Sequence, residues 1–213
     1  MRLLIAALSL LTGSASAQGD LALDSLRAED YHTAAESLRS GDLEGVDFRA
    51  ARYAFALTDG YSPYAVDAKR RSRRVRDHLD AGDPAAAVVS VDSTLAENYV
   101  DLDAHYWALV AHDQLGDADR AAHHAAVFDG LIGSILDSDQ GTEEDPFVVV
   151  NVTEEYVVLG ILGLQQTGQT LVGCGDVRCD VQSVVDPEDG AELDLYFDIS
   201  IPFGHMQRQL RAD

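Results

Sequence analysis

The sequence predicts an α+β protein in which an antiparallel helical array comes first and a small α+β unit with an antiparallel hairpin comes last. Alanine and other apolar residues recur at helical spacing from Leu21 to about Leu136, between short breaks that contain Gly or Asp. Farther on, apolar and polar residues alternate from Ala191 to Ile201, with the period of two of a β-strand. We therefore expect a signal peptide at 1–17, a helical repeat-like region at 18–136, an acidic linker loop at 137–146 and a small α+β region at 147–213.

The helical region contains two turns that resemble each other. Gly82 and Gly116 lie 34 residues apart, which is the period of a tetratricopeptide repeat. The residues around them also correspond: Val75 with Leu109, His78 with His112, Asp83 with Asp117, Ala87 with Ala121, and Val91 with Ala125. Small residues at the matched alanines let paired helices approach closely. The array is therefore expected to have tetratricopeptide-like repeat character, with further breaks at 41–42, 59–63 and 98–101.

The carboxyl-terminal third predicts a strand, a helix and a hairpin. Phe147–Val152 is a short β-branched run, and Thr153 is positioned to cap a helix that continues through Tyr156–Leu164. A strand that begins at Val177 should pair antiparallel with the alternating stretch, through a turn at Pro187–Gly190.

Charge limits the partners that this chain can have. The sequence holds 15 Lys and Arg against 37 Asp and Glu, for a net charge of −22, and 46% of its residues are hydrophobic. That apolar content is enough to bury a core. So much negative charge repels nucleic acid and anionic membranes, and no stretch after the leader is long and apolar enough for a membrane span. We expect no nucleic-acid partner and no integral membrane segment in the mature chain.

The beginning of the chain has the pattern of a secretory signal peptide. Arg2 precedes an apolar run at Leu3–Leu11, and small residues lead to Ala17 before Gln18, where we expect cleavage. No cysteine stands near this point to carry a lipid anchor. The mature protein is expected to be periplasmic or secreted.

The two cysteines, Cys174 and Cys179, are expected to form a disulfide. Export takes the chain to an oxidising compartment, where paired thiols oxidise. The bond would close a tight loop and so stabilise modestly, because the chain-entropy gain grows with loop length. Two cysteines without a nearby histidine are a weak basis for zinc.

Several short motifs together resemble an exported bacterial family catalogued as domain of unknown function 4919. The resemblance covers nearly the whole mature chain and rests on the order and spacing of the motifs. They are Phe48–Tyr53, then Tyr61, Ser62, Pro63 and Tyr64, then Leu115, Gly116 and Asp117, then Ser134, Ile135 and Leu136, the Gly141 loop, Phe147, Glu155 with Tyr156, Leu162, Gly163 and Leu164, and Leu195, Tyr196 and Phe197. This resemblance implies no activity, substrate or catalytic residues, because the family has none assigned.

Three acid- or histidine-rich patterns have alternative interpretations. His105 and His112 lie two helical turns apart, and they are either metal ligands or packing residues. The acidic stretch Asp137–Asp145 is either a solvated linker or a calcium loop, although its glycine does not fall where an EF-hand requires it. Glu154 and Glu155 could act as an acid/base pair only if they faced one cleft. No catalytic residue, metal site or cofactor is assigned.

The most unusual local feature is a basic cluster in this acidic chain: Lys69, Arg70, Arg71, Arg73, Arg74 and Arg76. Such a cluster can bind carboxylates or phosphates, or it can neutralise acidic neighbours within the fold. We expect an exported, non-enzymatic binding or scaffold protein of the cell envelope, with a protein or peptide partner at this cluster. The alternatives are an enzyme, hydrolase-like or metal-dependent, whose site forms only in the fold, and a purely structural envelope protein.

Overall fold

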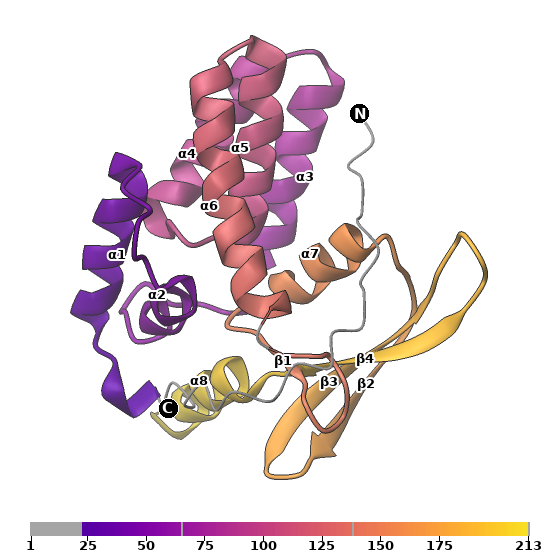
Figure 1. Cartoon of the computed structure of the whole chain (residues 1–213). Coiled ribbons are helices and arrows are strands. Elements are labelled where there is room, and N and C mark those ends of the chain that lie inside the picture. Colours follow the sequence, from indigo (N-terminus) through magenta and orange to yellow (C-terminus); the bar gives the residue numbers. More distant parts are fainter. Residues whose placement is uncertain (1–22, 65, 138, 213) are drawn as a thin grey trace.

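The computed structural model describes residues 23–64, 66–137 and 139–212, and it has the predicted α+β organisation. Figure 1 shows the helical array on one side, the sheet on the other, and a single helix, α7, between them. The predicted signal peptide and its cleavage site at Ala17 and Gln18 lie outside the described residues. No described helix combines the length and the apolar character that crossing a membrane requires.

Six helices form the array, after a 3-10 turn, η1 (Leu23–Ser25). They are α1 (Ala28–Ser40), α2 (Phe48–Phe55), α3 (Val66–Asp80), α4 (Pro84–Glu97), α5 (Leu102–Leu115) and α6 (Ala118–Leu136). Four of them begin at an aspartate whose carboxylate accepts a hydrogen bond from the backbone N–H three residues later, at 2.9–3.2 Å. These caps are Asp47, Asp83, Asp101 and Asp117. Part of the chain's acidity therefore serves to start helices.

The two turns that correspond in the sequence have the same local geometry. Gly82 and Gly116 have φ angles of 72° and 74°, in the left-handed region that favours glycine. Each is followed by one of the capping aspartates, and the matched alanines Ala87 and Ala121 are buried. The turns are thus equivalent, while tetratricopeptide-like character for the array as a whole stays a prediction.

Four strands form one sheet in the order β1-β4-β3-β2. Their bounds are β1 (Phe147–Val148), β2 (Gln165–Cys174), β3 (Val177–Val185) and β4 (Glu192–Asp198), with α7 (Val152–Leu162) after β1 and α8 (Ser200–Ala212) after β4. The expected hairpin of β3 and β4 is confirmed, with Gln182 opposite Leu195. Strand β1 pairs parallel with β4, and β2 pairs antiparallel with β3.

Three local predictions in this region are wrong in detail. Helix α7 is capped by Asn151 in a capping box with Glu154, not by Thr153. The expected strand at Phe147–Val152 stops after two residues, because this capping box starts the helix at Val152. Ile201 belongs to α8, which begins where the Asp198 carboxylate accepts from the Ser200 backbone N–H at 2.7 Å.

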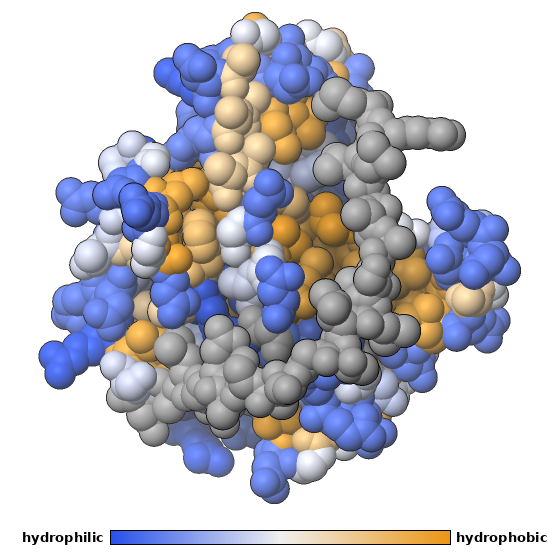
Figure 2. All heavy atoms as spheres, viewed as in Figure 1, coloured by the Kyte–Doolittle hydropathy of each residue, from blue (hydrophilic) through white to orange (hydrophobic). Residues whose placement is uncertain are grey.

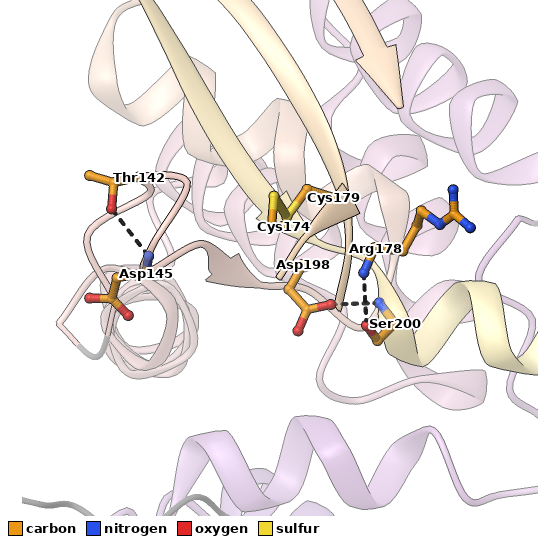
Figure 3. Close-up of a disulfide and its surroundings, with 7 residues drawn as sticks. All are labelled: Thr142, Asp145, Cys174, Arg178, Cys179, Asp198 and Ser200. Atoms are coloured by element: carbon orange, nitrogen blue, oxygen red, sulfur yellow. Dashed lines mark hydrogen bonds between the residues drawn. A yellow bond between two sulfur atoms is a disulfide. The ribbon is translucent and has the colours of Figure 1, made fainter. Parts of the chain in front are cut away.

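The disulfide between Cys174 and Cys179 is present, and it closes the tip of the hairpin of β2 and β3 (Figure 3). Gly175, with a φ angle of 58°, provides the turn between the two cysteines. Next to it, the Arg178 backbone N–H donates to the Ser200 hydroxyl at 3.4 Å, so the hairpin tip contacts the start of α8. The disulfide therefore joins β2 to β3 next to their connecting turn.

Loss of this disulfide should lower the free energy of unfolding by about 2 kcal/mol, because it closes only a short loop. We expect this change from wild type in the double variant Cys174→Ala, Cys179→Ala, measured by urea unfolding without reductant. The wild type should lose a similar amount when reductant is added, while the double variant should not respond to reductant. A wild-type unfolding curve that reductant leaves unchanged would contradict the prediction.

A buried ion pair joins the array to the α+β unit. Arg52 on α2 and Glu154 on α7 are 1% and 2% exposed. The Arg52 guanidinium donates to both oxygens of the Glu154 carboxylate, at 3.2 and 2.7 Å. It also donates to the Ser134 hydroxyl at 3.1 Å and to the Val148 carbonyl at 3.0 Å. One side chain thus fixes α2, α6, β1 and α7 relative to each other.

Candidate functional site

A cleft of about 500 Å³ lies where α7 meets the outer face of α3 and α5. Three helices supply its walls: Ser72, Arg73 and Arg76 from α3, Asp103, Tyr106 and Trp107 from α5, and Thr153, Tyr156, Val157, Gly160 and Ile161 from α7. In each helix these positions are one, three or four residues apart, so they share one helical face. On the face seen in Figure 2, hydrophobic surface gathers around α7.

The polar floor of the cleft is a small network around Asp103. Its carboxylate accepts from the Trp107 indole N–H at 3.0 Å and from the Ser72 hydroxyl. Burial raises the pKa of Asp103, and the two hydrogen bonds and the charge of Arg76 oppose that rise. The network holds the indole in one orientation, so the cleft has a preformed aromatic wall.

Aromatic and cationic groups meet at the same wall. The Arg76 guanidinium carbon lies 6.0 Å from the centre of the Trp107 ring, within the range of a cation–π contact. Tyr106 packs edge-to-face against Trp107 with ring centres 5.0 Å apart, and it remains 36% exposed. Arg73, one helical turn before Arg76, is exposed at the rim. The cleft thus combines an apolar interior with two cations at its edge.

The structure distributes the predicted basic cluster over different environments. Arg73 and Arg76 line the cleft, whereas Arg74 is exposed elsewhere on α3. Arg71 forms an ion pair with Glu97 at 2.9 Å, with side chains 35% and 66% exposed. Arg70 also has an interaction partner, and the side chain of Lys69 is not described. Within the described part of the chain, neither Arg73 nor Arg74 forms an ion pair.

The histidines of α5 lie on the opposite face of that helix, away from the cleft. His105 is fully buried, and its Nε2 lies 2.9 Å from the Tyr99 carbonyl oxygen, so this nitrogen must carry the proton. The other nitrogen, Nδ1, therefore accepts from Nδ1 of His124 on α6, at 3.0 Å. Burial lowers the pKa of His105 to about 4 and that of His124 to about 3. His105 and His124 thus form a neutral, hydrogen-bonded pair that joins α5 to α6.

A second and more open hollow, of about 480 Å³, lies beside this histidine pair. His112 and His124 line it together with Arg39 and Asp92, but His105 does not. His112 stacks on His124 with ring centres 5.5 Å apart and planes inclined by 9°. The hollow therefore brings His112, but not His105, together with the Asp92 carboxylate.

The acidic stretch contains a half-buried carboxylate, Asp139, that has protein partners. Asp139 pairs with Arg49 of α2 at 3.3 Å and accepts from the Val148 backbone N–H at 3.4 Å. Gly141, with a φ angle of 70°, packs against the Phe147 ring so closely that an added Cβ would lie 2.2 Å from it. In the described residues, no group of three or more His, Cys, Asp or Glu side chains could hold a metal ion.

The adjacent glutamates of α7 have separate partners. Glu154 pairs with Arg52, whereas the fully buried Glu155 accepts from the Gln182 side-chain amide on β3 at 2.6 Å. Successive helical residues diverge by about 100°, which directs one carboxylate to the array and the other to the sheet. They do not face a common cleft.

Sequence reasoning found the arginines but not the residues opposite them. Asp103, Tyr106 and Trp107 follow the Asp101 cap at positions that share one face of α5, and this spacing was a usable signal. The contribution of α7 had no comparable signal, because its approach to α5 depends on contacts between segments far apart in the chain. Thr153, expected as a cap, lines the cleft instead.

A family model described as domain of unknown function (DUF4919) matches residues 38–208. The matched stretch begins in α1 and ends in α8, so it contains every residue of the cleft. No match was found among curated proteins or among solved structures.

Proposed function

The chain belongs to the family described as domain of unknown function DUF4919, and for this member we propose the function of an exported binding protein of the cell envelope. Its ligand site is the cleft between α3, α5 and α7. The ligand is an anion, such as a carboxylate or phosphate, that also carries an apolar portion. The observation that carries this proposal is the presence of Arg73 and Arg76 at the rim of an aromatic cleft in a protein of net charge −22.

Charge supports an anionic ligand. An acidic surface repels anions in general, so cations placed at one cleft give local attraction and select against polyanions that must contact the rest of the surface. Guanidinium groups bind carboxylate and phosphate oxygens through paired N–H donors. Because Arg73 forms no ion pair with any described residue, binding there does not require breaking one.

The cleft interior supports an apolar portion in the ligand. Trp107, Tyr106 and Tyr156 offer aromatic surface, and Val157 and Ile161 add aliphatic surface. A volume of about 500 Å³ lies within the usual range of small-molecule sites, which bury mostly apolar surface and use a few polar groups for orientation. Asp103 already has its hydrogen bonds, so it serves to hold the wall in place.

Export is part of the same proposal. The amino-terminal pattern through Ala17 has the features of a cleaved leader, and the disulfide of Cys174 and Cys179 is the kind of bond that persists in an oxidising compartment. The protein therefore meets its ligand outside the cytoplasm.

Replacing both rim arginines should weaken binding of an amphiphilic anion. We expect the double variant Arg73→Gln, Arg76→Gln to bind 1-anilinonaphthalene-8-sulfonate at least about tenfold more weakly than the wild type, as each charge-assisted contact contributes about 1.5 kcal/mol or more. The uncharged probe N-phenyl-1-naphthylamine should bind both proteins equally. Fluorescence titration gives the constants, and Arg74→Gln on the same helix is the matched control. Equal sulfonate binding by wild type and double variant would reject the role of the arginines.

A second variant tests the cleft without changing any charge. An added Cβ at Gly160 meets no atom within 4 Å, so Gly160→Trp should place its ring in the open cleft without disturbing the fold. Replacing a helical glycine by tryptophan also favours the helix by roughly 0.3–0.5 kcal/mol. We expect this variant to lose binding of both probes at unchanged or higher stability. Retained binding would show that the probes bind elsewhere.

A further inference from the structure

Strand β2 forms an edge of the sheet that no described element covers. It pairs with β3 on one side only, and it is the last strand in the sheet order. Seven of its ten residues are exposed, and Leu171 is 51% exposed. In Figure 1 the hairpin of β2 and β3 extends beyond the helices. An edge of this length presents a row of backbone N–H and C=O groups that can pair with another strand.

The opposite side of the sheet is protected in ways that β2 is not. At the far end of β4, Phe197 and Asp198 pair with β1. The Tyr196 backbone N–H donates to the Gly141 carbonyl at 2.9 Å, so the acidic loop covers the next position. Nearer its start, β4 carries the charged residues Glu192 and Asp194. Charges and loop cover are the usual means by which natural sheets prevent edge pairing, and this side has both.

No charged residue interrupts the chain from Tyr156 to Gly175, a stretch that includes all of β2. The protein has a net charge of −22, so two copies repel each other over most of their surfaces. The strand itself adds no charge to this repulsion, and the neighbouring carboxylate of Asp180 on β3 is buried and accepts a hydrogen bond from the Gln169 side-chain amide. Proline, which would remove a backbone donor, is also missing from the strand. The edge that can pair thus presents no charged side chain of its own to a second copy.

We propose that β2 pairs antiparallel with β2 of a second copy of this chain, about a twofold axis near Thr170, so that the two sheets become one. The register shift between Gln166 and Gly168 limits regular pairing to the part of the strand that follows it, and Thr170 lies within that part. In this arrangement Thr170 faces its own counterpart, and Gln169 lies opposite Leu171 of the second copy. A strand paired with itself about a twofold axis is self-complementary, as a closed dimer requires.

Opposite charges introduced at Thr170 provide the test. In the twofold arrangement, Thr170→Lys and Thr170→Asp each place two like charges face to face, so both should weaken the dimer by about two- to fivefold. Gln209→Lys on the exposed face of α8 is the matched control and should leave it unchanged. Sedimentation equilibrium of the mature chain, at concentrations from about 1 µM to about 1 mM, gives the dissociation constants. Circular dichroism checks that each variant is folded.

The outcomes separate self-pairing from its alternatives. A wild-type dimer that both Thr170 variants weaken, with concentration-dependent protection of β2 amides from hydrogen exchange, supports the proposal. A dimer that Thr170→Lys strengthens and Thr170→Asp weakens would instead show β2 docking on an acidic surface, and would overturn it. A chain that remains monomeric throughout the concentration range would also overturn it. If a Thr170 variant is unfolded, the amide protection of the wild type decides by itself.

Discussion

Arg52→Met is expected to lower the free energy of unfolding by about 3–5 kcal/mol, because it removes one partner of a buried ion pair. Glu154, 2% exposed, would then be left with the Val150 backbone N–H at 2.8 Å as its best remaining donor. The Ser134 hydroxyl and the Val148 carbonyl would each lose a donor as well. A loss of this size is a large share of the 5–15 kcal/mol that is typical of a whole domain.

A double-mutant cycle separates the ion pair from the rest of the change. Urea unfolding should show Glu154→Gln destabilised to a similar extent, while Arg52→Met with Glu154→Gln should lose clearly less than the sum of the two single variants. Arg49→Met is the control on the same helix. Its ion pair with Asp139 lies nearer the surface, at 23% and 12% exposure, so we expect it to cost at most about 1 kcal/mol. Strictly additive single changes would show that the two residues do not act as a pair.

The sequence predicted the elements well wherever local chemistry decides. Helix breaks at Gly82 and Gly116 depend on the left-handed conformation that glycine adopts readily, and they fall where expected. The alternation of apolar and polar residues from Ala191 is also a local pattern, and it predicted β4 and its pairing with β3. Strand β2 was missed because it is neither buried on one face nor regularly alternating, so it has no hydrophobic period to detect.

The site was predictable only on the side that a single helix supplies. The basic cluster is contiguous in the sequence, so its position on α3 follows from composition. That Arg73 and Arg76 face Trp107 while Arg71 pairs with Glu97 depends on how α3 packs against α4 and α5. The role of Arg52 was likewise hidden, because its partner Glu154 lies 102 residues farther along the chain. Such long-range contacts have no local pattern in a single sequence.

The buried pair of His105 and His124 should make the free energy of unfolding fall steeply in mild acid. In the unfolded chain a histidine titrates near pH 6.5, whereas burial lowers the pKa of His105 to about 4 and of His124 to about 3. Between these values the unfolded state binds protons that the folded state does not. Stability from these residues is therefore complete above about pH 6.5 and is lost progressively as the pH falls toward the folded pKa values. Protonation of His105 would also break the hydrogen bond between the two histidines, because the His105 Nδ1 that accepts from His124 would become a donor.

His124→Asn isolates this effect, because the asparagine amide can still donate to His105 in place of the imidazole Nδ1. We expect the loss of unfolding free energy between about pH 7 and about pH 4.5 to be smaller in this variant than in wild type by about 2 kcal/mol, since one lowered pKa has been removed. Asp101, whose pKa burial raises to about 6, contributes a trend of the opposite sign in both proteins and so cancels in the comparison. His32→Asn, at an exposed position of α1, should keep the wild-type pH dependence. Urea unfolding at a series of pH values gives the free energy of unfolding of all three proteins. Parallel curves of this free energy against pH for His124→Asn and wild type would show that the buried histidine pair does not govern acid stability.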